Sequence, residues 1–457
     1  MRFIYISLLL TIIMSCKSDM KDNGNIDQYS YDLGVVGGFS ELVAAGVKKM
    51  AFSSPMKPEK MDAFIIEAEK IAKRHGVSVY REKDLLITDL FPHDVARGLD
   101  VLLLYKGTAF DVYQKLKSDQ KLLIDNGRYN EAAQLNISKR LGRLLSYSPR
   151  KINSLLTEQT SFRTMDDFGI KAHNLFLYYK DLKAAGDFYT QIMGMELVAD
   201  YEMALILRMT RDSYLILVDA TKGMHTADEP KSVALALLTD QLDEWYDYLK
   251  SQNVKIKYDY KPKEGSAHDG FVVEDPEGYL LEMERFNQHP ENEDFVPLLE
   301  YDKGKEVNQH SDRKLPEGLK IHSTITWLYH KDVLGIEGFH QDILGLELVA
   351  DQGWTKIYQI SGTGYIAIVD ERRGMNKYSE KKAVSVGFIL DDLEGWFNYV
   401  SDHNVMPLRE DEISTGPESK YRAFVGYGPE NYFYEFDVFL PHENNTKLLD
   451  YLESTIH

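Results

Sequence analysis

The chain has 457 residues, of which 44% are hydrophobic and 12% aromatic, a globular composition with room for about three domains. The formal net charge is −19, and an acidic surface repels phosphate, so nucleic acid is excluded as an expected partner. The single cysteine, Cys16, excludes an intramolecular disulfide and a cysteine-ligated metal cluster.

The N-terminus has the pattern of an export signal. Met1-Arg2 is followed by an apolar run over residues 3–14 and then by Ser15-Cys16. The run is too short for a comfortable membrane span and suits a signal peptide. Because Ile13-Met14-Ser15-Cys16 resembles a bacterial lipobox, we expect a signal peptide at 1–15, lipidation of Cys16 and a polar tether at 16–30. The chain would then be a membrane-anchored lipoprotein of the bacterial cell envelope, facing the periplasm or the exterior. An ordinary signal peptide with an incidental cysteine is the alternative.

Residues 31–165 do not repeat and predict a small α/β domain whose role the sequence does not indicate. Apolar periodicity predicts helices over 39–47 and 59–75, strands over 49–53, 77–80 and 99–105, and further helices between 109 and 156. The glycines of GVVGG at 34–38 favour a turn, with an anion-binding loop as the alternative. Pro92-His93-Asp94 is either a helix start or an acid–base pair.

The remainder of the chain contains one domain twice. MGMELVAD at 193–200 recurs as LGLELVAD at 344–351, and YLILVD at 214–219 recurs as YIAIVD at 365–370. We therefore expect two copies, at 170–288 and 319–443, with a linker at 289–318 and a tail at 444–457. The apolar pattern predicts that each copy contains the element order βαβββ twice in succession. The predicted class is α+β, with paired βαβββ modules that form cupped mixed sheets.

Two motifs carry a family resemblance. Phe188-Tyr189 precedes GMEL, and the sequence DPEGYLLE at 275–282 returns in weaker form as GPENYFYE at 428–435. Both motifs resemble those of the vicinal oxygen chelate superfamily, which includes glyoxalase I, extradiol dioxygenases and bleomycin-resistance proteins. The resemblance implies that ligands on the first, fifth and last strands hold a divalent metal, such as Fe, Mn, Ni or Zn, on which substrate oxygens chelate.

The implied ligand set is incomplete in this sequence. The closing glutamates would be Glu282 and Glu435, but Ala234 and Ser385 stand where the fifth-strand ligands belong. The remaining candidates are His173, one residue out of register, His322, three residues out, and Asp219 at the end of a fourth strand. We therefore expect no cofactor, with a divalent metal as the alternative.

The first strand of each copy predicts what lines the cup. Period-two alternation places Asn174, Phe176 and Tyr178 on one face in the first copy, and Trp327 and Tyr329 in the second. Such aromatic walls favour a small aromatic or carbonyl-bearing ligand. Two alternatives remain: a metal-dependent lyase, isomerase or dioxygenase that acts in the first copy through Glu282, His173 and Asp219, or a structural scaffold whose cups are filled by their own side chains.

Overall fold

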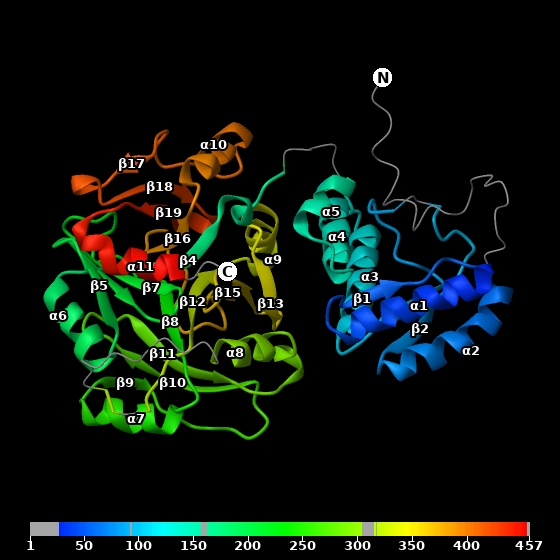
Figure 1. The fold of residues 1–457 in the computed structure, drawn as a ribbon, viewed down its shortest axis with the longest axis horizontal. Helices are drawn as coiled ribbons and strands as arrows, with labels where there is room; N and C mark the ends of the chain where they lie inside the picture. Colours follow the sequence, from blue (N-terminus) through cyan, green and yellow to red (C-terminus); the bar gives the residue numbers. More distant parts are fainter. Residues whose placement is uncertain (1–26, 92–93, 157–161, 304–314, 317, 455–457) are drawn as a thin grey trace. The chain divides into compact units, whose positions relative to one another are not determined.

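The computed structural model describes residues 27–91, 94–156, 162–303, 315–316 and 318–454. The chain divides into two compact units, Met1–Phe162 and Arg163–His457, which are described separately (Figure 1). The predicted signal peptide and Cys16 lie outside the described residues. Within the described ranges, no helix has the length and apolar character needed to span a bilayer.

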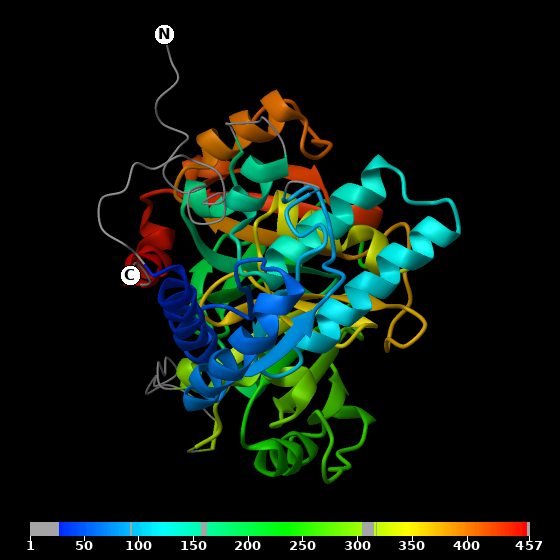
Figure 2. The ribbon, with the colours of Figure 1, turned by 90° about the vertical axis from the view of Figure 1, so that its right-hand side faces the viewer.

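The first unit is a three-stranded antiparallel sheet with helices on both faces, in agreement with the predicted α/β domain. The strand order is β1-β3-β2. Its strands are β1 (Met50–Phe52), β2 (Ser78–Glu82) and β3 (Val101–Tyr105), and its helices are α1 (Gln28–Ala44), α2 (Pro58–Arg74), α3 (Ala109–Asp125), α4 (Glu131–Leu144) and α5 (Pro149–Leu156). Strand β3 is apolar throughout because Leu102 and Leu104 pack with α1 and α2, while Val101 and Leu103 pack on the opposite face with α3 and α4. Figure 2 shows the ribbon of this unit in blue and cyan.

The glycine-rich segment of this unit is helical, so both the turn and the anion-binding loop predicted at 34–38 are wrong. Helix α1 begins at Gln28, where the side chain of Asp27 accepts hydrogen bonds from the backbone N–H groups of Tyr29 and Ser30. Val36 and Val43 are buried along one side of the helix. The N-terminal cap and tertiary packing therefore override the low helix propensity of glycine. Pro92 and His93 lie outside the described residues.

The second unit contains four βαβββ modules, as predicted, two in each repeat. The first repeat comprises β4 (Ile170–Tyr179), α6 (Leu182–Asp187), β5 (Glu196–Asp200), β6 (Ala204–Arg208), β7 (Ser213–Asp219), β8 (Val233–Leu238), α7 (Leu242–Ser251), β9 (Lys255–Tyr258), β10 (His268–Glu274) and β11 (Leu280–Phe286). The second comprises β12 (Ser323–His330), α9 (Val333–Gly338), β13 (Glu347–Asp351), β14 (Thr355–Gln359), β15 (Gly364–Asp370), β16 (Val384–Leu390), α10 (Leu393–His403), β17 (Ser414–Thr415), β18 (Tyr421–Tyr427) and β19 (Phe433–Phe439).

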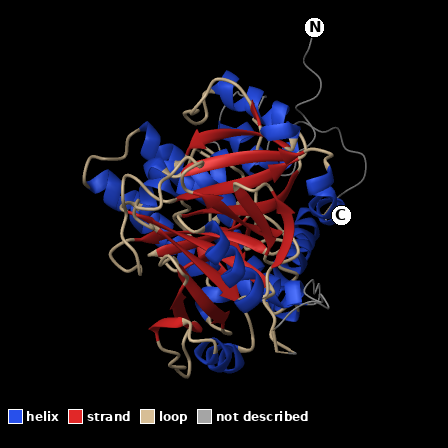
Figure 3. Ribbon diagram, turned by 90° about the vertical axis from the view of Figure 1, so that its left-hand side faces the viewer, coloured by secondary structure: helices blue, strands red, loops and turns tan. Residues whose placement is uncertain are grey.

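The two repeats exchange modules, so neither repeat closes a cup by itself. The first sheet has the order β17-β18-β19-β16-β4-β7-β6-β5, and the second has the order β13-β14-β15-β12-β8-β11-β10-β9. The strands are the red arrows of Figure 3. Antiparallel ladders join the modules: β4 pairs with β16, and β8 pairs with β12. Each sheet therefore combines half of one repeat with half of the other.

The two faces of each sheet pack against different helices. We call the face that carries Asn174, Phe176 and Tyr178 in the first sheet, or Trp327 and Tyr329 in the second, the inner face. The opposite faces belong to one large apolar cluster with the helices α6, α7 and α10, and this cluster also includes Phe176 and Tyr178 of the first inner face. The predicted linker and tail contain two further helices, α8 (Phe295–Lys303) and α11 (Thr446–Ser454), which contact side chains of the inner faces.

Candidate binding sites on the inner faces of the two sheets

The candidate site of the first sheet is built from the first strand of one repeat and the last strands of the other. The Nδ2 of Asn174 on β4 donates to Oδ2 of Asp437 on β19 at 3.1 Å. The hydroxyl groups of Tyr178 and Ser385 are 2.9 Å apart. Ser385 stands at the fifth-strand ligand position of the second repeat, as Ala234 does in the first. In the structure it shares a site with Asn174 and Tyr178. Glu282 is on the second sheet and takes no part in it.

Two carboxyl groups lie side by side on the inner face of β19. Glu435 and Asp437 are two residues apart, so both point to the same face of the strand. They are 9% and 2% exposed. Burial, together with the adjacent Asp437, raises the pKa of Glu435 well above its usual value. Burial also raises the pKa of Asp437 to about 7, against the opposing effect of the hydrogen bond from Asn174.

The sequence reasoning identified Glu435 and missed Asp437. The same applies to the second sheet, where Glu284 follows the predicted Glu282 on β11. Burial raises the pKa of Glu282 to about 7 and that of Glu284 well above its usual value. The period-two spacing of the acidic residues was the available signal, because a second acid at i+2 on a buried strand must share the inner face with the first.

The inner face of the second sheet is largely filled by α8. Phe295 on this helix packs against Phe286 and Tyr365, with ring centroids 4.9 and 5.0 Å apart. Asp302, near the end of α8, accepts hydrogen bonds from the hydroxyl groups of Tyr365 at 2.9 Å and Ser323 at 3.2 Å. Trp327 and Tyr329, predicted as ligand-binding residues, belong to the same apolar cluster as Phe295. On this face the cluster packs as apolar core, while Trp327 Nε1 and Glu284 Oε2 are buried without a hydrogen-bond partner among the described residues.

Helix α11 covers one end of the inner face of the first sheet. The ring of Tyr451 lies 3.6 Å from the guanidinium carbon of Arg208 on β6, and its hydroxyl group is 3.1 Å from Oε1 of Glu196 on β5. Lys447 forms an ion pair with the same glutamate. These contacts are at the β5–β6 edge, whereas Tyr178, Ser385 and Glu435 lie on the central strands. The central part of the face is thus distinct from the part that α11 covers.

His225, which the sequence reasoning did not select, lies beside the aromatic side chains of the first site. Its ring centroid is 5.0 Å from that of Tyr178 and 4.4 Å from that of Phe433. Its Nδ1 is 2.8 Å from Oε2 of Glu229, and its Nε2 is buried without a hydrogen-bond partner among the described residues. Burial lowers the pKa of His225, although Glu229 opposes this shift. A lone histidine in a long loop gives no sequence signal for this position.

The predicted metal-ligand grouping of His173, Asp219 and Glu282 is not formed. His173 faces away from Asn174 and links the two sheets, because Nε2 is 2.9 Å from Oγ1 of Thr326 and Nδ1 is 3.2 Å from the carbonyl oxygen of Gly387. Asp219 accepts hydrogen bonds from Thr221 in a tight turn. The register slip and the exchange of modules together separate the three residues.

The second predicted pair, Glu435 and His322, is also separated. His322 precedes β12 of the second sheet, where Nδ1 is 3.1 Å from the hydroxyl of Ser323, while Glu435 lies on the first sheet. In the described ranges no three histidine, cysteine, aspartate or glutamate side chains form a group that could hold a metal ion. The groups near Glu435 are a second carboxyl group, an amide and two hydroxyl groups; the imidazole beside this site, His225, does not form with Glu435 and Asp437 a group of three that could hold a metal ion, so these described residues do not fit a site for Fe, Mn, Ni or Zn.

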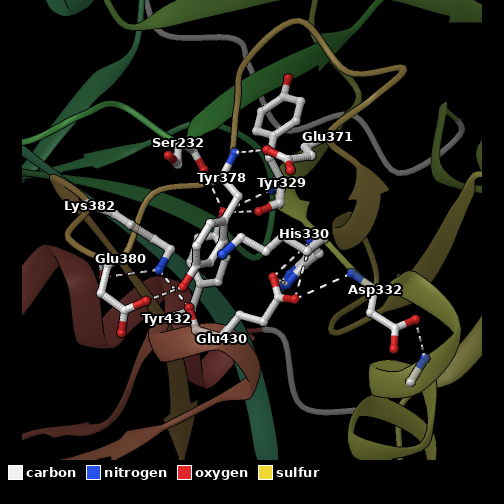
Figure 4. A network of polar contacts seen from close by, with 12 residues as sticks. Ser232, Tyr329, His330, Asp332, Glu371, Tyr378, Glu380, Lys382, Glu430 and Tyr432 are labelled. Atoms are coloured by element: carbon white, nitrogen blue, oxygen red, sulfur yellow. Dashed lines mark hydrogen bonds and ion pairs between the residues drawn. The ribbon is translucent and has the colours of Figure 1, made fainter.

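The acidic residue of each DPEG-type motif has a structural role. Glu430 accepts hydrogen bonds from the backbone N–H groups of Lys331 and Asp332 at the start of α9, and its backbone carbonyl accepts one from Lys382 (Figure 4). Glu277 does the same for the backbone at the start of α6. The motif therefore fixes the connection between the first strand and the first helix of a module, and it identifies the fold.

Comparison with known proteins agrees with this fold. Residues 171–283 match the family model of the Glyoxalase/Bleomycin resistance protein/Dioxygenase superfamily, which confirms the resemblance over this part of the chain. Glyoxalase I from Zea mays is 14% identical with a TM-score of 0.41, over 63% of this chain and 96% of its own. Lactoylglutathione lyase from Agrobacterium tumefaciens is 21% identical with a TM-score of 0.22, over 24% and 90%. No curated protein sequence matches the chain.

Proposed function

We propose that the chain is a small-molecule-binding protein that uses the central part of the inner face of the first sheet and needs no divalent metal ion. The observation that carries this proposal is a group of buried polar atoms without partners. Asn174 Oδ1, Glu435 Oε2 and His225 Nε2 have no hydrogen-bond partner among the described residues. Buried polar atoms are normally paired, and unpaired ones gather where a ligand or solvent completes the bonding.

Aromatic side chains on the same inner face also suit a small planar ligand. Phe176 and Tyr178 lie on the same strand face as Asn174, and Phe433 lies on the same face as Glu435. Rings of this kind bind a planar ligand by stacking and by burial of apolar area. The second sheet supports the scaffold role instead, since α8 occupies its inner face with Phe295, Val296 and Leu299.

The cell-envelope location belongs to the same proposal. Its support is the lipobox-like sequence before Cys16, which would leave both repeats outside the cytoplasm on a lipid anchor. A protein tethered in this way meets small molecules that enter the envelope. The metal-dependent lyase, isomerase or dioxygenase remains the competing hypothesis, although the donor set at Glu435 and Asp437 does not favour it.

One experiment separates these functions. A fragment library of small aromatic and carbonyl compounds is screened by thermal shift and calorimetry against the protein and against two variants, Glu435→Gln and Glu282→Gln. These glutamates occupy equivalent positions on β19 and β11. We expect hits whose affinity falls only in Glu435→Gln. Hits that require added Fe, Mn, Ni or Zn would favour the metal-dependent enzyme, and hits weakened only by Glu282→Gln would move the site to the second sheet.

A further inference from the structure

The unpartnered atoms of the first site share one chemical character, since all of them can accept hydrogen bonds. Asn174 uses its Nδ2 to donate to Asp437, so that the amide oxygen is left to accept. The carboxylate of Glu229 can only accept, which assigns the hydrogen of the neutral His225 ring to Nδ1 and leaves Nε2 as an acceptor. The carboxyl oxygens of Glu435 and Asp437 complete the set.

Potential donors near this set do not pair with Asn174 Oδ1, Glu435 Oε2 or His225 Nε2 in the described residues. The hydroxyl groups of Tyr178 and Ser385 are paired with each other. Arg409 lies over the ring of Phe433 at 5.8 Å, and its Nε is 3.8 Å from a carboxylate oxygen of Glu410. A ligand that fits these positions must therefore bring its own N–H donors.

The rings and the carboxyl pair define the shape and charge of such a ligand. The ring centroid of His225 lies 5.0 Å from that of Tyr178 and 4.4 Å from that of Phe433, and the three rings form a mostly apolar wall. A planar cation stacks on aromatic faces and at the same time donates parallel N–H bonds to a carboxylate. A bound cation lowers the pKa of adjacent carboxyl groups, so it would favour the ionised form of a pair whose pKa values burial raises.

We propose that the first inner face binds a planar organic cation of the amidinium or guanidinium class, attached to an aromatic or apolar body. This inference rests on the proposed function and adds the chemical class of the ligand. Asp437 and Glu435 accept the paired N–H donors, Asn174 Oδ1 and His225 Nε2 accept from the remaining edge, and the body of the ligand lies against Phe176 and Tyr178.

The second sheet provides the matched comparison. Glu284 corresponds to Asp437 in the repeat, and Ile325 corresponds to Asn174. Ile325 has no hydrogen-bonding group, and Phe295 and Leu299 of α8 pack in the same cluster. We expect the carboxyl pair of the second sheet to bind no such cation, although it has the same spacing.

The test uses three probes of nearly equal shape, benzamidine, benzamide and benzoate, in titration calorimetry at pH 7.5 with the full chain. We expect benzamidine to bind at least tenfold more tightly than benzamide, and benzoate more weakly than both. Asp437→Asn and His225→Phe should each weaken benzamidine binding at least fivefold, whereas Glu284→Gln should leave it unchanged. Tryptophan fluorescence of each variant checks that the second unit is folded.

The outcomes distinguish this inference from the proposed function. Equal or tighter binding of benzamide or benzoate, or a loss of benzamidine binding in Glu284→Gln, would overturn the assignment of a cation. If none of the three probes binds while other members of the fragment library bind in a Glu435-dependent way, the cation assignment fails and the proposed function stands. If no compound in either set binds, both fail.

Discussion

Replacing Asp437 with asparagine should stabilise the second unit at high pH. Burial raises the pKa of Asp437 from 3.8 to about 7, and one pKa unit corresponds to about 1.4 kcal/mol. Because the folded protein holds this proton more tightly than the unfolded chain, the free energy of unfolding falls as pH rises from about 4 to about 7, and it is level above that. The ionised carboxylate therefore costs about 4 kcal/mol above pH 7. Asparagine removes this penalty but weakens the acceptor for Asn174 by about 1 kcal/mol.

The expected net gain is about 2–3 kcal/mol at pH 8, with almost no difference at pH 4. All 4 tryptophans of the chain lie in the second unit, so denaturant unfolding followed by tryptophan fluorescence reports this unit within the full chain. Asp219→Asn is the control, because hydrogen bonds from Thr221 lower the pKa of Asp219, and this variant should lose stability at pH 8. Parallel stability profiles of the protein and Asp437→Asn between pH 4 and pH 8 would refute the reasoning.

Three further outcomes are expected. Burial lowers the pKa of His173 to about 4, so the stability of the second unit should decline as pH falls from about 6.5 to about 4, and His173→Gln should flatten this decline in the same fluorescence assay. Phe295→Ala should cost about 3–5 kcal/mol by leaving a cavity under α8, against less than about 0.5 kcal/mol for the largely exposed Tyr301→Ala. Cys16→Ser should move the protein from the membrane fraction to the soluble fraction, and an unchanged fractionation would contradict lipid anchoring.

Much of the fold was accessible from the sequence because its determinants are local and repeated. Recurrence of MGMELVAD revealed the duplication, since Gly194 and Gly345 both take a left-handed conformation that ends a helix before a strand. The DPEG-type motifs are preserved because their acids bind the backbone at the start of α6 and α9. These local contacts form within a module whichever other module it pairs with. The motifs therefore indicate the fold of each module but not its pairing partner.

The composition of the sites could not be predicted, because it depends on which modules pair. Strand β4 can form an antiparallel ladder with β8 of its own repeat or with β16 of the other, and the apolar alternation of both strands suits either choice. The structure has β4 paired with β16. This pairing brings Asn174 next to Asp437 and puts Glu282 on the other sheet. The predicted metal ligands are therefore separated, although the predicted fold class is confirmed.

The exchange of modules also explains why the two equivalent carboxyl pairs have different neighbouring residues. Each carboxyl pair shares its sheet with the first strand of the other repeat, so part of its surroundings comes from that repeat; Asn174, which donates to Asp437, is 263 positions away from it in the sequence. Asn174 holds Asp437 in the first sheet, while Ile325 stands at the corresponding position of the second. A substitution in one repeat therefore changes the site completed by the other. The repeats could diverge into one polar site and one packed core without any change in the motifs that define the fold.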